Sequence, residues 1–202
     1  NVMRVVELYE GVGIAGLHIE DQCVPKKYQP DGFPQVVPMD EHCDKIRAAA
    51  AARKDPDFCI IARTDSLQRY GIHEAVKRGN AYKEAGADMV FVHGASERKD
   101  LELIVKEIDI PNVVNYSTLR EGGVFPLPTM AELTELGFKL VIVAGELLFC
   151  AARAMDLMLE ELSARDGLEN ADCDFMKFDR FSKVLDIAKY TDIENKYLPV
   201  KD

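Results

Sequence analysis

Short apolar runs alternate with longer amphipathic segments along most of this chain. Each short continuous apolar run predicts a buried strand, and each longer segment with apolar residues at helical spacing predicts a helix. Strands are expected at residues 14–20, 57–65, 88–94, 112–117 and 139–145. Helices are expected at residues 1–11, 40–53, 72–85, 98–108, 129–136 and 147–164.

The order of these segments predicts an α/β fold with a parallel sheet. Each of the expected strands is followed by a helix, which makes five βα units after an initial helix. Strands that are apolar throughout and separated by helices belong to parallel sheets buried on both faces. Two closures are compatible with this order, an open doubly wound sheet and a (β/α)₈ barrel. No G-x-G-x-x-G motif follows a strand, which disfavours a dinucleotide-binding open sheet.

Two segments depart from the alternation. Residues 21–38 form a long polar loop rich in proline, and a loop of this length in a compact domain is usually functional or disordered. The end of the chain is charged, with spaced aromatic residues, and predicts one or two short amphipathic helices. We therefore expect a partial barrel at 1–168 and a helical tail at 169–202, which packs on the barrel or on a partner subunit.

Composition narrows the class of protein. The chain has 202 residues and a formal net charge of −10, which argues against a nucleic-acid partner and against attraction to anionic lipid. No apolar run approaches the roughly 18 residues that would cross a bilayer, so no membrane partner is expected. The five cysteines form no C-x-x-C pair, which gives a zinc site no support and favours a reduced, cytoplasmic location.

Polar side chains follow the predicted strands where parallel α/β proteins bind their ligands, at the carboxyl ends. A carboxylate there suits Mg²⁺, and a guanidinium there suits a carboxylate or phosphonate. The set predicts a site for a small polyanion held beside a cation. Its members are Glu20 and Asp21, Arg63 and Asp65, His93, Asn115 and Ser117.

Each of these residues also has a structural interpretation. Glu20 or Asp21 could cap the loop that follows, and Arg63 could form an ion pair with Asp65 or Glu20. His93 could be a histidine with satisfied hydrogen bonds at a strand end. The combination therefore argues more strongly for a site than any one of its members.

Three motifs in this order resemble the isocitrate lyase/phosphoenolpyruvate mutase superfamily. They are IEDQ followed by PKK, then DPDFCIIARTD, then EAGADMVFVH, within a resemblance that runs from residue 1 to about 165. It implies a (β/α)₈ barrel, bound Mg²⁺ or Mn²⁺, and a small 2-oxo or 2-hydroxy acid. It implies cleavage or formation of a C–C or P–C bond through an enolpyruvate-like intermediate. It also implies homodimers or homotetramers that exchange the last barrel helix.

The same resemblance assigns roles to individual residues. It implies three catalytic residues, three substrate-binding residues and one metal-associated residue. One residue belongs to both the catalytic and the substrate-binding group. The implied catalytic residues are Lys26, Arg63 and His93, the substrate-binding residues are Arg63, Asn115 and Ser117, and the metal-associated residue is Glu20.

The loop after the first strand departs from the family patterns. Lyases that cleave isocitrates carry K-[KR]-C-G-H there, with the cysteine as acid and base, whereas this chain has KKYQP at residues 26–30. Mutase-like members carry asparagine where Tyr28 stands. The missing cysteine favours an oxaloacetate-type substrate over an isocitrate, and the missing asparagine gives plain phosphonomutase activity no support.

The front of the family domain has no counterpart in this chain. In the family, three further βα units with magnesium-binding aspartates precede the helix expected at 1–11. The chain is therefore expected to be either a fragment or an N-terminally shortened barrel with an incomplete metal site. Two hypotheses follow: a Mg²⁺-dependent lyase, or a catalytically inactive shortened homologue that serves as a structural or partner subunit. A third, a barrel with a phosphate site, is disfavoured by the few glycines after the last strands.

Overall fold

The computed structural model describes residues 1–26, 32–117, 119–120, 123–124, 128–165 and 174–198. Contacts divide the chain into two compact units, Asn1–Leu147 and Leu148–Asp202. The division into a partial barrel at 1–168 and a tail at 169–202 stays a prediction. The helix expected at 147–164 buries no residue.

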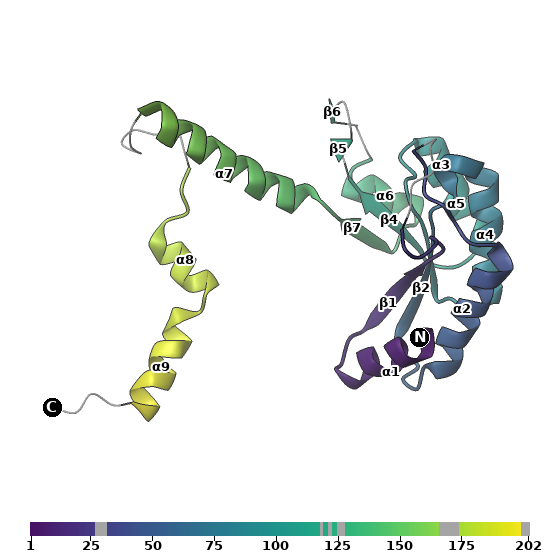
Figure 1. Ribbon diagram of the computed structural model, residues 1–202, viewed down its shortest axis with the longest axis horizontal. Coiled ribbons are helices and arrows are strands. Elements are labelled where there is room, and N and C mark those ends of the chain that lie inside the picture. Colours follow the sequence, from purple (N-terminus) through teal and green to yellow (C-terminus); the bar gives the residue numbers. More distant parts are fainter. Residues whose placement is uncertain (27–31, 118, 121–122, 125–127, 166–173, 199–202) are drawn as a thin grey trace. The chain divides into compact units, whose positions relative to one another are not determined.

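A five-stranded parallel sheet is the centre of the first unit (Figure 1). Its strands follow one another in chain order, and every neighbouring pair is parallel. A doubly wound sheet reverses its strand order at a switch point, and this sheet does not. The expected parallel α/β fold is confirmed, and the sheet has the strand order of a half-barrel. The strands are β1 (Gly16–Glu20), β2 (Cys59–Thr64), β3 (Met89–Val92), β4 (Asn112–Tyr116) and β7 (Leu140–Val143).

Helices pack against one face of this sheet. Strand residues Ala62, Val90 and Val92 point to that face and are buried against apolar helix residues. All helices expected in this unit are present, with ends shifted by a residue or two. They are α1 (Val2–Gly11), α2 (Met39–Ala52), α4 (Ile72–Glu84), α5 (Arg98–Glu107) and α6 (Met130–Leu136).

The opposite face of the sheet has its own apolar cluster, formed only by strand residues. Side chains alternate between the faces along a strand, so Arg63, His93 and Asn115 project from this same face, nearer its carboxyl edge. This second face therefore carries apolar residues at its middle and polar residues at one rim. The cluster consists of Ile61, Phe91 and Val113 with Cys59, Met89 and Ile142.

Local signals explain where elements end. Thr129 caps α6 by accepting a hydrogen bond from the Glu132 backbone N–H, and the Glu132 side chain accepts one in return from Thr129, which is a capping box. Gly137 ends the helix with φ at +111°, a left-handed conformation that glycine adopts without strain. The short elements α3 (Leu67–Tyr70), β5 (Leu119–Arg120) and β6 (Gly123–Val124) were not expected, because two to four residues carry no readable periodicity.

The second unit contains most of α7 (Glu146–Arg165), together with α8 (Phe178–Val184) and α9 (Ile187–Tyr197). The two short helices expected in the tail are thus confirmed as α8 and α9. None of the three helices buries a residue, and α7 carries exposed apolar side chains such as Leu148 and Phe149. Within the part of the chain that is described, no helix has the length and apolarity needed to cross a membrane.

Candidate active site

The strand register aligns the predicted site residues at one edge of the sheet. Glu20 lies opposite Arg63, and Arg63 lies opposite Phe91. His93 follows Phe91 by two residues and therefore projects from the same face. Asn115 has the same relation to Val113, which lies opposite Phe91. The expected convergence of these residues at the carboxyl rim is what the register produces.

A continuous row of charged contacts runs along this rim. Lys26 Nζ lies 2.7 Å from Glu20 Oε1, and Glu20 Oε2 lies 3.7 Å from Arg63 Nε. Arg63 then donates two hydrogen bonds to Asp65, from Nε at 2.9 Å and from Nη2 at 2.7 Å. The guanidinium also lies over the Phe91 ring, 5.3 Å from its centroid. Two cationic side chains and two carboxylates meet here, so their formal charges cancel.

Asp65 links Arg63 to His93. His93 Nδ1 lies 2.8 Å from Asp65 Oδ1, and the Asp65 side chain is only 1% exposed. Burial by itself would raise the pKa of Asp65, but the hydrogen bonds from His93 and Arg63 outweigh it and hold that pKa well below its ordinary value. Since an ionised carboxylate only accepts hydrogen bonds, the His93 proton belongs on Nδ1. The Nε2 atom is then the one available to a ligand.

Asn115 and Ser117 occupy the neighbouring strand end. Asn115 is half-buried, and its Oδ1 has no hydrogen-bond partner among the residues that the structure describes. Buried polar atoms are normally paired, so this orphaned oxygen marks a place where a bound donor fits. Ser117 is half-buried just beyond the end of β4.

Asp21 has a different role from its neighbour Glu20. It is fully buried, and its carboxylate accepts four hydrogen bonds, from the Thr64 hydroxyl (2.7 Å), the Asp65 backbone N–H (2.9 Å), Arg78 Nη1 (3.0 Å) and the Tyr82 hydroxyl (2.8 Å). Burial and the Asp21 carboxylate raise the pKa of Tyr82, which keeps its hydroxyl protonated and able to donate. Asp21 therefore does not face a ligand.

Arg78 and Tyr82 were not among the residues predicted for the site. Both belong to α4, one helical turn apart, and nothing in their spacing distinguishes them from the surface residues of an ordinary amphipathic helix. Only their burial, and the carboxylate that they share across 57 and 61 residues of chain, identifies them.

The loop that carries Lys26 is closed at its base by backbone hydrogen bonds. Val37 N–H donates to Asp21 O, and Cys23 N–H donates to Gln35 O, both at 2.8 Å. Lys26 stands on this loop with 58% of its side chain exposed. Residues 27–31, which include the motif position Tyr28, lie outside the described part of the chain.

The described residues do not form a complete metal site. No group of three or more histidine, cysteine, aspartate or glutamate side chains among them is arranged to hold an ion. Glu20 fits one position in the coordination shell of Mg²⁺, since this ion commonly takes one or two carboxylates and completes its shell with water and substrate oxygens. Its two oxygens already face Lys26 and Arg63.

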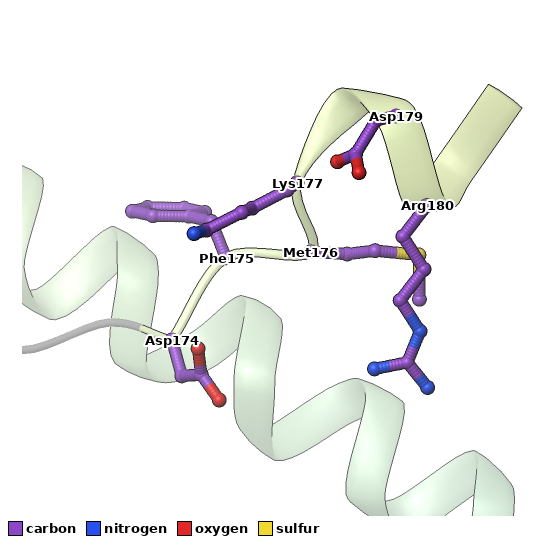
Figure 2. A pocket seen from close by; sticks show the side chains of 6 residues that line it. All are labelled: Asp174, Phe175, Met176, Lys177, Asp179 and Arg180. Atoms are coloured by element: carbon purple, nitrogen blue, oxygen red, sulfur yellow. The ribbon is translucent and has the colours of Figure 1, made fainter.

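An open cavity of about 460 Å³ lies elsewhere, in the second unit. Its lining residues precede α8 or lie on its first turn (Figure 2). The charges around it are of both signs, and it contains none of the residues predicted for the site. The residues that line this cavity are Asp174, Phe175, Met176, Lys177, Asp179 and Arg180.

Comparison with known protein families identifies the family to which this chain belongs. Residues 1–163 match the family described as phosphoenolpyruvate phosphomutase. The chain belongs to the phosphoenolpyruvate mutase/isocitrate lyase superfamily. The resemblance inferred from the three motifs is therefore confirmed.

Relatives within the superfamily include characterised lyases. A 2,3-dimethylmalate lyase of Eubacterium barkeri is 35% identical over 98% of this chain and 67% of its own length. A 2-methylisocitrate lyase of Escherichia coli is 40% identical over 66% of this chain and 44% of its own length. The petal death protein of Dianthus caryophyllus is 34% identical, and this chain spans 61% of it. The chain thus covers about two thirds or less of these relatives.

Solved structures agree with this assignment. A phosphoenolpyruvate phosphomutase from Streptomyces platensis superposes with a TM-score of 0.84 at 28% identity, over 97% of this chain and 68% of that one. An oxaloacetate acetylhydrolase bound to 3,3-difluorooxalacetate gives 0.82 at 29% identity, over 96% and 65%. A phosphonopyruvate hydrolase in complex with oxalate and Mg²⁺ gives 0.78 at 28% identity, over 98% and 68%.

Proposed function

We propose that this chain has the activity of a Mg²⁺-dependent lyase. The reaction is cleavage of a C–C or P–C bond in a small 2-oxo or 2-hydroxy dicarboxylate, of the oxaloacetate type, through an enolpyruvate-like intermediate. The observation that carries the proposal is the row of contacts from Lys26 through Glu20, Arg63 and Asp65 to His93. It joins the end of β1, the ends of β2 and β3 and the loop after β1 into one polar rim.

The charges of this rim favour a metal ion and a dianion that bind together. The two cations and two carboxylates of the row cancel, so a dianion alone adds uncompensated negative charge, and Mg²⁺ alone adds positive charge. A dicarboxylate that arrives with Mg²⁺ leaves the local charge unchanged. Each ligand should therefore increase the affinity for the other, which is a reciprocal coupling.

The roles of the side chains follow from their positions. Asp65 occupies the Nε–Nη2 edge of Arg63, and the remaining Nη donors bind a substrate carboxylate. His93 presents Nε2 as a hydrogen-bonding or proton-transfer atom. Asn115 and Ser117 bind a further substrate oxygen. Lys26 brings a cation to the substrate on a loop that excludes water when it closes.

Glu20 is the residue that would associate with the metal ion, directly or through water. Mg²⁺, when bound, polarises the substrate oxygens and stabilises the developing enolate. Because Lys26 pairs with Glu20, Lys26 would reach a substrate only after this pair opens.

An inactive homologue remains the second candidate. It is favoured by the lack of three clustered metal-binding side chains in the described ranges. Under this hypothesis the chain is a structural or partner subunit, and its rim binds neither Mg²⁺ nor a dicarboxylate.

We further propose that the five βα units belong to a (β/α)₈ barrel and that the protein is a cytoplasmic homodimer or homotetramer. Support for the barrel comes from the unreversed strand order and from the helices that pack along one face of the sheet. In such an oligomer the subunits would exchange α7. Support for this exchange comes from the apolar residues Leu148, Phe149 and Leu159 of α7, which are 69%, 56% and 58% exposed.

Thermal stabilisation by oxalate and Mg²⁺ tests the function. Oxalate resembles an enolate, and a ligand at one hundred times its Kd stabilises the native state by about 2.7 kcal/mol. We expect a larger rise in Tm with both ligands than the sum of the rises with each alone. No shift with both at millimolar concentration would favour the inactive homologue. A panel of oxaloacetate, 2-methylisocitrate, 2,3-dimethylmalate and phosphonopyruvate then identifies the substrate.

A further inference from the structure

Arg63 and His93 come from neighbouring strands but share one buried partner. Asp65 Oδ1 lies 2.7 Å from Arg63 Nη2 and 2.8 Å from His93 Nδ1, while Asp65 Oδ2 accepts from Arg63 Nε at 2.9 Å. Because the Asp65 side chain is 1% exposed, it meets both groups from the protein side. We propose that Asp65 is a positioning residue that orients Arg63 and His93 toward one bound anion, and that buried Asp21 holds Asp65 in place.

The geometry restricts both side chains. A bidentate pair through Nε and Nη2 fixes the plane of the Arg63 guanidinium and leaves its other donors in one direction. The contact at Nδ1 fixes the orientation of the His93 ring and the position of its proton. Edge-on packing against Phe91, with ring centroids 5.7 Å apart and planes at 86°, restricts the ring further. Two ligand-facing groups are thus ordered before a ligand arrives, which lowers the entropy lost on binding.

Asp21 supplies the support behind Asp65. Its Oδ1 accepts the Asp65 backbone N–H, and its Oδ2 accepts the Thr64 hydroxyl. The same Oδ2 is bound by Arg78 and Tyr82 of α4. Asp21 therefore connects an outer helix to the residue that orients the rim, although none of these groups touches a ligand position.

This inference rests on the proposed function, because it names the residues that order the same anion site. The test uses Asp65→Asn in the full 202-residue chain. Asparagine keeps the shape but turns one acceptor into an NH₂ group that faces a donor. We expect oxalate affinity in the presence of Mg²⁺, measured by titration calorimetry, to fall about tenfold or more, since hydrogen bonds to charged groups are lost.

Asp88→Asn is the matched control. Asp88 directly precedes β3, at the end of the sheet opposite the rim. It pairs with Arg53 and accepts a hydrogen bond from the Ile60 backbone N–H. The substitution weakens another arginine–aspartate pair, which is joined by a single hydrogen bond and lies away from the rim. We expect its oxalate affinity to remain within about twofold of the wild type. Equal affinities for Asp65→Asn and Asp88→Asn would overturn the positioning role.

A second measurement does not depend on any ligand. Long-range ¹H–¹⁵N spectra of the wild type identify the tautomer of each histidine, and His93→Gln assigns the His93 signals. We expect the neutral His93 ring to carry its proton on Nδ1. A proton on Nε2 would overturn the role of Asp65 even if oxalate binds. If the wild type does not bind oxalate, the proposed function fails, and this spectrum still decides the Asp65–His93 contact.

Tyr82→Phe tests the contribution of Asp21 with little risk to the fold. It removes one of the four hydrogen bonds on Asp21 and keeps the ring volume. We expect a fall in oxalate affinity of up to about fivefold, smaller than that for Asp65→Asn. An unchanged affinity would show that Asp21 supports the fold alone and would remove it from the proposal.

Discussion

The imidazole of His42 packs edge-on against the ring of Tyr82, with centroids 4.6 Å apart and planes at 65°. His42 is completely buried, and neither ring nitrogen has a hydrogen-bond partner among the described residues. Burial lowers the pKa of His42 to about 4, against the opposing effect of the Asp21 carboxylate. A neutral histidine is thus held next to the group that supports the candidate site.

This arrangement predicts an acid-sensitive fold. The unfolded chain takes up a proton at His42 as the pH falls through about 6.5, whereas the folded chain does not until about pH 4, so stability declines between these values. We expect a loss of roughly 3 kcal/mol from this group across the window. His42→Phe should abolish that part of the loss, as measured by urea unfolding from pH 7 downward. The exposed His73→Phe is the control, and an equal effect there would contradict the prediction.

Asp65 acts in a lower pH window. Its folded-state pKa is depressed, so the stability that it contributes is complete above its unfolded pKa of about 3.9 and is lost as the pH falls toward the folded value. We expect Asp65→Asn to be less stable than the wild type at pH 7 and to show a shallower decline below about pH 5. If urea unfolding showed the same decline in stability with falling pH for the variant and the wild type, this prediction would be wrong. Asp109→Asn, at a side chain that is 98% exposed, is the control.

The two partners of Asp21 on α4 should differ in importance. Arg78→Met leaves a buried carboxylate without its cation, and breaking a buried ion pair in this way costs about 3–5 kcal/mol. Tyr82→Phe removes one hydrogen bond and should cost about 1 kcal/mol. Guanidinium unfolding at pH 7 measures both. Similar losses for the two variants would mean that the Arg78 charge contributes little.

Arg63→Lys tests whether the guanidinium shape matters. Lysine keeps the charge but cannot bind Asp65 and a carboxylate at the same time through separate edges. We expect oxalate affinity in the presence of Mg²⁺ to fall about tenfold or more, which is at least 1.4 kcal/mol. Arg53→Lys, at the far end of the sheet, breaks a similar pair with Asp88 and should leave the affinity unchanged. An unaltered affinity in Arg63→Lys would exclude Arg63 as the carboxylate anchor.

Most of the secondary structure was predictable because the apolar pattern is regular. The segment at residues 57–65 has an unbroken apolar run from Phe58 to Ala62, and its core Cys59–Thr64 is β2. By contrast, α3 is four residues long and has no amphipathic signature. The sequence also did not show that α7 buries none of its residues, because a helical pattern does not reveal whether the helix is packed.

The sequence by itself determined which side chains reach the rim. Strand alternation places Glu20, Arg63, His93 and Asn115 on one face, since residues two apart point the same way. Only the tertiary structure decided which of these side chains have a fixed orientation and which residues fix it. Alternation also turns Asp21, one residue after Glu20, toward the helices and Asp65, two residues after Arg63, toward the rim. It does not name their partners, because donors such as Arg78 lie far from Asp21 in the chain and only the fold brings them to the carboxylate.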